Sequence, residues 1–517
     1  MNLTFDNRFV RRLPADPDLA NVPRQVARAA YTRVGPTPVR SPRTLAVADE
    51  VAESLGLTAG HTASQRFADV FGGNDLLPGM EPFAACYGGH QFGNWAGQLG
   101  DGRAITLGEV VAPTGRFELQ LKGAGTTPYS RGGDGRAVLR SSVREFLCSE
   151  AMHHLGIPTT RALSLVATGD PVLRDMFYDG HPADEPGAVV CRVAPTFIRF
   201  GNFEIFAARN DPTSLGKLAD FVLEAYFPHL GARTPASMLA LFREVGERTL
   251  ATVTAWMRVG FVHGVMNTDN MSILGLTIDY GPYGWLEPYD PAWTPNTTDE
   301  GRGRYRYGTQ PQVALWNLAR LAEALFPLIG DPAPLEASLQ ELHDGLRARD
   351  LAMMASKLGL ATPDAALIDA LREVLARAEV DWTLFFRALA EVPLDAGAPT
   401  SIPSSLADAW YQPLAEADRA AVLAWLAGYA ARARLDGVDD ASRCERMNAV
   451  NPLYVLRNWL AQEAIDRATQ GDVSGIAELL DVLRHPYTPQ PGRGSYAVRR
   501  PEWARHRAGC SMLSCSS

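Results

Sequence analysis

Long apolar runs are missing from this sequence. No uninterrupted stretch reaches the roughly 18 residues that a membrane-spanning helix requires, and the first residues lack the apolar core of a secretory signal. We therefore expect a soluble, cytoplasmic protein that has no membrane partner.

A surplus of positive charge is missing as well. Lys and Arg number 49 and Asp and Glu 58, which gives a formal net charge of −9. Because proteins that bind nucleic acids usually carry a basic excess, we expect no nucleic-acid partner. Two arginine-rich segments, 8–43 and 493–507, are most simply explained as solvated or internally paired surface.

Cysteine is sparse, and its spacing excludes a zinc ribbon. The six cysteines include no CxxC pair and have no histidines at ligand spacing. Cys86, Cys148 and Cys191 have apolar neighbours, which predicts burial in a core. Cys510 and Cys515 lie in a short polar tail, where we expect exposed thiols that either serve redox chemistry or have no function.

Internal repeats and low-complexity tracts are absent, and 517 residues exceed what one hydrophobic core usually supports. Short strand-like runs with glycine turns dominate residues 86–200, and apolar positions three and four apart then predict helices over 214–227, 236–259 and 312–328. Residues 280–311 lack such periodicity and predict a long functional loop. The predicted fold class is α+β, with a sheet lobe followed by a helical lobe.

A strand predicted at 116–122 ends in a lysine beside glycine-rich turns. Its alternating pattern places the apolar residues on one face and Lys122 on the other. The turns at 97–103 and 123–136 could let backbone N–H groups approach phosphate oxygens, although plain hairpin turns have the same composition. The adjacent lysine favours a phosphate site.

Glu145 lies early in a helix that the sequence predicts to begin near Ser141 and Ser142. One interpretation is a capping box, in which Glu145 reaches back to the main chain of Ser142. The other is an ion pair with Lys122, because protein kinases hold an ATP-binding lysine with a glutamate on the following helix. The order strand, loop, helix favours the ion pair.

Residues 263–270, followed by an Asp-Tyr-Gly sequence at 279–281, resemble the catalytic loop and the metal-binding motif of protein kinases. The position of the catalytic aspartate is occupied by Val265, which cannot accept a proton. Asp269 is the nearest carboxylate in the sequence and is the candidate base. These motifs predict a two-lobed, protein-kinase-like (pseudokinase) fold with N-terminal and C-terminal extensions. The predicted divisions are an N-terminal extension, 1–85; a sheet lobe with glycine-rich loops, 86–205; a helical lobe with the catalytic and metal motifs, 206–490; and a cysteine-containing tail, 491–517.

Asn270 and Asp279 occupy the positions of the kinase metal ligands. Because both offer oxygen atoms, the expected ion is Mg²⁺ or Mn²⁺. The apolar residues between them suit a short hairpin that turns near Gly275 and brings Asp279 back to Asp269.

Three further residues invite interpretation. Arg192 and Arg199 stand among strand-like apolar residues, so they need an anionic partner such as a triphosphate if they point inward; exposure on the surface is the alternative. His90, within a Gly-Gly-His-Gln-Phe-Gly sequence, is expected to pack in a loop, and the sequence identifies no partner for it.

Together these features resemble the selenoprotein O family, whose members are described as protein adenylyltransferases with a pseudokinase fold. The segments that carry the resemblance are 88–93, 122–145, 263–284, 451–458 and 514–517. The resemblance implies transfer of AMP from ATP to Ser, Thr or Tyr hydroxyls of proteins, the enzyme itself included, with release of diphosphate and with UTP as a further nucleotide. It also implies that ATP binds inverted relative to kinases, with its α-phosphorus facing the acceptor.

The resemblance also implies residue roles. The implied nucleotide contacts are Gly100, Gly102, Arg103, Lys122, Asp134, Gly135, Arg192, Arg199 and Asp279. Asp269 would be the proton acceptor, and Asn270 and Asp279 would hold Mg²⁺ or Mn²⁺. Some members carry selenocysteine at the place of Cys515, but the loop 280–311 has no cysteine with which it could pair, which leaves Cys510 as the nearby candidate.

Two other functions stay open on the sequence alone. One is an ordinary phosphotransferase, a kinase that acts on protein or small-molecule hydroxyls with Asp269 as its base. The other is a non-catalytic scaffold that binds a nucleotide, which the valine at position 265 favours.

Overall fold

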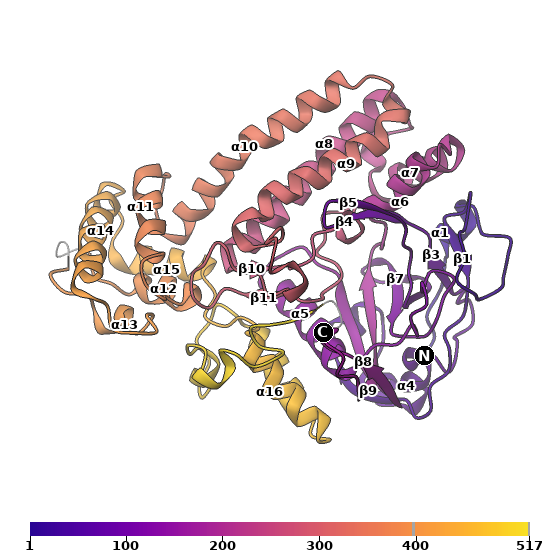
Figure 1. The fold of residues 1–517 in the computed structure, drawn as a ribbon, viewed down its shortest axis with the longest axis horizontal. Helices are drawn as coiled ribbons and strands as arrows, with labels where there is room; N and C mark the ends of the chain where they lie inside the picture. The colour runs from indigo at the N-terminus through magenta and orange to yellow at the C-terminus, as the bar shows by residue number, and fades with distance from the viewer. Residues whose placement is uncertain (395–398, 515–517) are drawn as a thin grey trace.

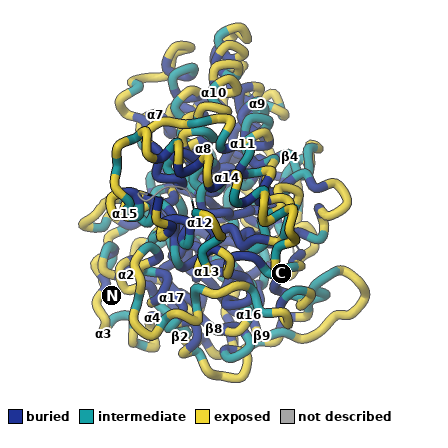
Figure 2. Tube along the Cα trace, turned by 90° about the vertical axis from the view of Figure 1, so that its left-hand side faces the viewer, coloured by how far each residue is buried: buried dark blue, intermediate teal, exposed yellow. Residues whose placement is uncertain are grey.

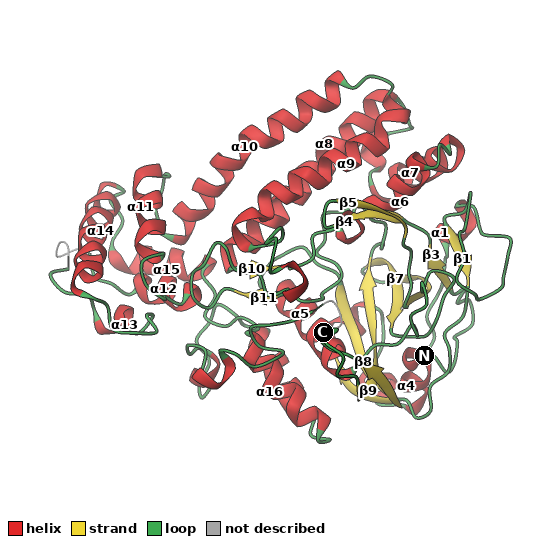
Figure 3. Ribbon diagram, viewed as in Figure 1, coloured by secondary structure: helices red, strands yellow, loops and turns green. Residues whose placement is uncertain are grey.

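The computed structural model describes residues 1–394 and 399–514 and has a mixed α+β fold, which confirms the predicted class (Figure 1). Strands dominate the chain before residue 200, and helices dominate after it (Figure 3). No helix in these two ranges is both long enough and apolar enough to cross a membrane.

A seven-stranded antiparallel sheet organises the first part of the described chain, in the order β1-β3-β6-β7-β9-β8-β2. Its strands are β1 (Tyr31–Arg33), β2 (Arg43–Val47), β3 (Phe83–Ala85), β6 (Ala104–Ala112), β7 (Gly115–Lys122), β8 (Arg161–Arg174) and β9 (Ala183–Ala194). β7 lies in the middle, between β6 and β9. Both edge strands come from residues 1–85, so this segment completes the sheet on either side.

Strand β7 agrees with the predicted strand 116–122, which it extends by one residue. Leu119 and Leu121 are fully buried, as the alternating pattern predicts. The polar residues that alternate with them are buried too, since Glu118 is 4% exposed and Gln120 is 0% exposed. Both faces of the sheet are therefore covered.

Helix α5 (Leu139–His154) follows β7 and packs against β8 and β9. It begins two residues before the predicted start at Ser141, with Val138 as its N-cap residue and no side-chain cap. Ser142 is thus already inside the helix, and the capping box considered for Ser142 and Glu145 does not form. Glu145 is free to point at the sheet.

The helices after the sheet follow the predicted periodicity. The predictions 214–227, 236–259 and 312–328 correspond to α7 (Pro212–Tyr226), α8 (Pro235–Val259) and α9 (Gln310–Ile329). The others are α6 (Phe200–Ala208), α10 (Ala333–Lys357), α11 (Ala365–Leu375), α12 (Trp382–Ala390), α13 (Ser404–Ala407), α14 (Glu416–Leu435), α15 (Asp440–Val450), α16 (Asn458–Thr469) and α17 (Ser474–Leu483). Four short helices, α1 (Arg8–Arg12), α2 (Asp49–Ser54), α3 (Ala59–Thr62) and α4 (Gln65–Gly72), belong to the N-terminal segment.

Two hydrophobic cores hold these elements together. Buried residues run through the interior of the molecule, and exposed ones lie mostly along its outer loops (Figure 2). The larger one joins the sheet to α5–α9, α16 and α17, and the smaller one lies among α11–α15. Two cores agree with the expectation that a chain of this length exceeds a single one.

The segments that carry the predicted motifs are mostly irregular. Two small two-stranded sheets accompany them: the hairpin of β4 (Gly88–Gln91) with β5 (Asn94–Gln98), and the pair β10 (Phe261–Val262) with β11 (Gly284–Trp285). Between β10 and β11, the chain forms a short 3₁₀ turn, η2 (Thr268–Asn270), and then reverses at Gly275, where Met271 pairs with Thr277. The predicted turn at Gly275 is confirmed, and it returns Asp279 toward η2.

Candidate active site

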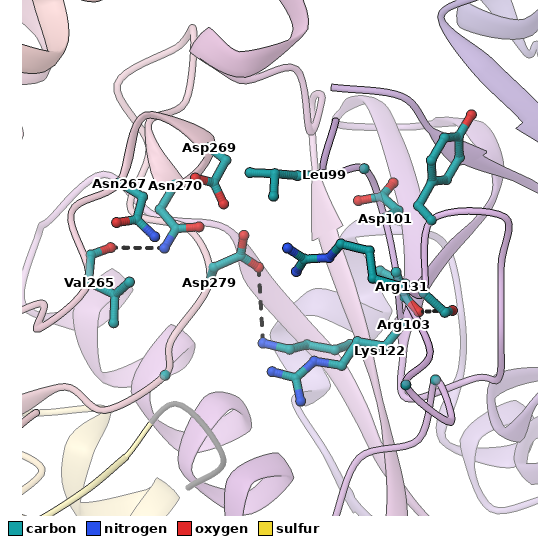
Figure 4. A pocket seen from close by; sticks show the side chains of 18 of the residues that line it. Leu99, Asp101, Arg103, Lys122, Arg131, Val265, Asn267, Asp269, Asn270 and Asp279 are labelled. Carbon is teal, nitrogen blue, oxygen red and sulfur yellow. Dashed lines mark hydrogen bonds and ion pairs between the residues drawn. The ribbon is translucent and has the colours of Figure 1, made fainter. Parts of the chain in front are cut away.

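A cavity of about 820 Å³ opens where the sheet meets the loops around η2. Its lining includes ten of the residues singled out in the sequence: Gly100, Gly102, Arg103, Lys122, Asp134, Gly135, Arg192, Asp269, Asn270 and Asp279. Figure 4 shows Arg103 and Lys122 on one side of the cavity and Asp269, Asn270 and Asp279 on the other. Arg199 and Glu145 lie behind this lining and contact it. Segments separated by more than 150 residues in the sequence therefore meet at one site.

Lys122, the last residue of β7, forms a buried ion pair with Glu145 of α5. The Nζ atom lies 2.6 Å from Oε2 of Glu145, and the two side chains are 11% and 3% exposed. Burial lowers the pKa of Lys122, and the carboxylate of Glu145 opposes that effect. Glu145 therefore forms the predicted ion pair with Lys122 and not the capping box with Ser142.

Asp279 forms ion pairs with two arginines. Arg192 binds its Oδ1 atom, and Nη1 of Arg199 lies 2.5 Å from Oδ2. Burial opposes ionisation of Asp279, but Arg199 and Arg192 hold its pKa well below the usual range. Both arginines are buried, so surface exposure is excluded for them, and the anion that they meet is a carboxylate of the chain itself. The backbone of Asp279 is left-handed, with φ +60°, which is uncommon for a residue other than glycine and typical of strained functional positions.

Asp269 lies beside these groups and is 8% exposed. Its Oδ2 atom accepts a hydrogen bond of 3.2 Å from Nε2 of Gln91, while Oδ1 has no partner within the described residues. Burial raises the pKa of Asp269 to about 7, although Arg199 and Gln91 act in the opposite direction. A carboxyl group with a pKa in this range can exchange a proton near neutral pH.

Asn270 is oriented by the residue that replaces the kinase base. Its Nδ2 atom donates to the main-chain oxygen of Val265 at 2.8 Å, which leaves the side-chain oxygen available to the cavity. Among the described residues, no cluster of three or more His, Cys, Asp or Glu side chains could hold a metal ion. Asn270 and Asp279 both line the cavity, and their side chains carry oxygen atoms, the kind of ligand that Mg²⁺ takes.

The glycine-rich turns form the opposite wall of the cavity. Gly100 has φ +80°, and a Cβ atom there would lie 2.4 Å from the ring of Tyr129, so the chain passes too close for any other residue. Arg103, which also lines this wall, adds positive charge beside Lys122. Asp134 is exposed, and its carboxylate takes two hydrogen bonds of 2.7 Å from Arg174.

The sequence did not predict the contacts of three further residues near the site. His90 does have a partner, because its Nδ1 atom lies 2.5 Å from Oε2 of Glu204 in α6. Gln91 and Asp101 also line the cavity, and Asp101 accepts from the main-chain nitrogen of Ala85 at 3.0 Å. The Gly-Gly-His-Gln-Phe-Gly sequence drew attention to the segment that contains His90 and Gln91, but nothing in it indicates which residues these two contact.

The C-terminal tail folds back toward the site, which corrects the expectation for Cys510. Leu513 pairs with Asn296, and Nδ2 of Asn458 donates to the main-chain oxygen of Cys510 at 2.7 Å. Cys510 is consequently 4% exposed, and burial raises the pKa of its thiol to about 11. Cys86, Cys148 and Cys191 are buried as predicted. Cys515 lies outside the described residues.

The family model described as protein adenylyltransferase SelO matches residues 19–484. The chain belongs to the SelO family. Three similar proteins carry the name protein nucleotidyltransferase YdiU. The one from Azoarcus sp. (strain BH72) is 61% identical over 520 residues, which cover 100% of this chain and 99% of the relative. The relative from Aromatoleum aromaticum is 59% identical over 529 residues, and that from Xanthomonas campestris pv. campestris (strain 8004) is 61% identical over 521 residues, each covering 100% of both chains.

Membership of the SelO family confirms the resemblance that the motifs indicated. The chain is accordingly an enzyme of the nucleotidyltransferase class, and the non-catalytic scaffold is set aside.

Proposed function

We propose that this SelO protein transfers AMP from ATP to Ser, Thr or Tyr hydroxyls of proteins, itself included, and releases diphosphate. One observation carries the proposal: the Lys122–Glu145 pair and the Asn270–Asp279 pair face one cavity, while a valine occupies the kinase base position. The family description as an adenylyltransferase agrees with it. A protein-kinase-like, two-lobed pseudokinase fold would present these groups in this way.

Nucleotide phosphates would bind between the glycine-rich turns and the buried cations. Arg103 and Lys122 supply positive charge at the cavity wall, and Glu145 keeps Lys122 in place. Arg192 and Arg199 neutralise Asp279 in the described state. When a nucleotide binds, its phosphate oxygens would compete with Asp279 for these two guanidinium groups. The carboxylate of Asp279 would then become available for other contacts.

Asn270 and Asp279 would hold Mg²⁺ or Mn²⁺. The bound ion would neutralise charge that develops on the phosphate oxygens. Two features of the chain would favour binding of this ion: the main-chain oxygen of Val265 orients the Asn270 side chain, and the low pKa of Asp279 keeps its carboxylate ionised.

Asp269 would accept the proton of the acceptor hydroxyl. It is the carboxylate next to Asn270, and it lines the same cavity. The resemblance further suggests that ATP binds inverted, so that the oxygen of the acceptor attacks the α-phosphorus and the bond to the β-phosphate bridging oxygen breaks. UTP would enter the same site, and we expect the enzyme to act in the cytoplasm.

The test compares ATP labelled on the α-phosphorus with ATP labelled on the γ-phosphorus. AMP transfer labels acceptor proteins from the α-position and adds about 329 Da, whereas a kinase labels from the γ-position and adds roughly 80 Da. Incorporation of the γ-label alone would overturn the proposal in favour of the phosphotransferase.

A further inference from the structure

Strand β4 supplies none of the proposed nucleotide contacts, yet Gln91 at its end lines the cavity and lies directly against Asp269. The side-chain amide of Gln91 donates to Oδ2 of Asp269 at 3.2 Å. The strand also approaches from the other side of the carboxylate, because a Cβ atom on Gly89 would lie 2.9 Å from Oδ1 and 3.0 Å from Cβ of Asp269. The carboxylate is thus enclosed by one residue that binds it and one that makes room for it.

The neighbours of Gln91 hold the strand in register with the loop. The main-chain nitrogen of His90 donates to Oγ1 of Thr268 at 2.7 Å, and that of Phe92 donates to Oδ1 of Asn267 at 3.2 Å. Three successive residues of one segment therefore contact three successive residues of the other.

Two further contacts anchor this arrangement from outside. The contact between Nδ1 of His90 and Oε2 of Glu204 ties β4 to α6, and Glu204 is 4% exposed. The hydroxyl group of Tyr305 donates to Oδ1 of Asn267 at 2.6 Å and accepts from the main-chain nitrogen of Phe92 at 2.9 Å. Such surroundings leave the Asp269 carboxylate little freedom to change its rotamer.

We propose that β4 is the positioning element of the active site and that Gln91 is a positioning residue that orients the carboxylate of Asp269 toward the acceptor hydroxyl. This inference rests on the proposed role of Asp269. A proton acceptor must lie within hydrogen-bond reach of the hydroxyl, and a misplacement of about 1 Å can cost roughly 100-fold in rate. Gln91 binds Oδ2 while Oδ1 is buried against Gly89, so the two residues together fix the direction of the whole carboxylate.

The test uses matched substitutions on one hairpin of the full-length protein. Gln91→Met removes the donor and keeps the length of the side chain. Asn94→Leu makes the equivalent exchange at the residue that pairs with Gln91 across the turn; Asn94 is exposed and donates to the main-chain oxygen of Phe92 instead. Transfer of AMP to an acceptor protein is measured at varied ATP concentration, together with the melting temperature.

We expect Gln91→Met to lower kcat by about 10-fold to 100-fold, with the KM for ATP and the melting temperature unchanged. Asn94→Leu should match the wild type in all three quantities. Gln91→Asn, which keeps an amide but shortens the side chain, should also lose kcat, because the amide no longer reaches Asp269. A wild-type kcat for Gln91→Met would overturn the inference, and so would a loss of kcat accompanied by a raised KM and a lowered melting temperature.

Asp269→Asn, assayed in parallel, separates the two proposals. If this variant keeps the wild-type kcat, the proposed base is wrong, and the inference about Gln91 is overturned with it. If Asp269→Asn is inactive while Gln91→Met is fully active, the base stands and the positioning role alone is overturned.

Discussion

Arg199 Nη1 lies 2.5 Å from Oδ2 of Asp279 and also donates to the main-chain oxygen of Asp269 at 2.9 Å. One buried guanidinium group therefore joins the proposed base to a proposed metal ligand. Arg199→Met should abolish transfer and lower the free energy of unfolding by about 3 kcal/mol, because it leaves a buried carboxylate with one fewer partner. Denaturant titration and an AMP-transfer assay check both parts. Full activity in a stable variant would contradict the assignment.

Lys122→Ala should abolish transfer while the protein stays folded. The substitution removes the cation at the end of β7 and weakens ATP binding by about 10-fold to 100-fold, as expected for the loss of one charge-assisted hydrogen bond. Calorimetric titration with ATP measures this change. Lys217→Ala serves as the control, because Lys217 lies on α7 outside the cavity lining. Unchanged ATP affinity in Lys122→Ala would exclude a phosphate-binding role.

Stabilisation by ATP should depend on a divalent cation and on Asp279. A ligand that binds the native state raises the melting temperature, so ATP with Mg²⁺ should raise that of the wild type, and a chelator should reduce the shift. In Asp279→Ala the dependence on Mg²⁺ should disappear and transfer should cease. Asp170→Ala removes an aspartate from outside the cavity lining and should behave as the wild type. A wild-type shift in Asp279→Ala would refute the metal assignment.

Stability should fall as pH rises because of Glu118. Burial raises the pKa of Glu118 to about 8, so the native state keeps a proton that the unfolded state has already released above its ordinary pKa. The free energy of unfolding should therefore decrease between these two pKa values, by about 1.4 kcal/mol per pH unit at most. Between roughly pH 5.5 and pH 7.5, the free energy of unfolding of Glu118→Gln should fall by about 2 kcal/mol less than that of the wild type, as measured by chemical denaturation. An unchanged slope would mean that Glu118 is ionised in the native state.

The parts of the site that the sequence predicted correctly depend on local patterns. The alternating strand placed Lys122 opposite its apolar face, and the order of strand, loop and helix indicated Glu145 as its partner. The glycine at position 275 indicated the turn that returns Asp279 to Asp269. Periodicity likewise predicted α7, α8 and α9 to within two residues at each end.

What the sequence could not predict are contacts between distant segments. The hydrogen bond from Gln91 to Asp269 joins residues 178 positions apart, and no local pattern encodes such a distance. Cys510 looked exposed because its neighbours are polar, but the tail docks on residues far upstream and buries it. For Arg192 and Arg199 the sequence left open surface exposure or an inward-facing anionic partner, and it did not indicate that Asp279 supplies the negative charge from within the chain.

The sheet takes both of its edge strands from residues 1–85, β1 at one side and β2 at the other. A fragment that started at residue 86 would keep the groups that line the cavity but would lose β1, β2 and β3, which leaves β6 and β8 with unpaired N–H and C=O groups at two open borders. Such borders recruit strands from other molecules. We therefore expect a chain without its N-terminal segment to self-associate through these open borders.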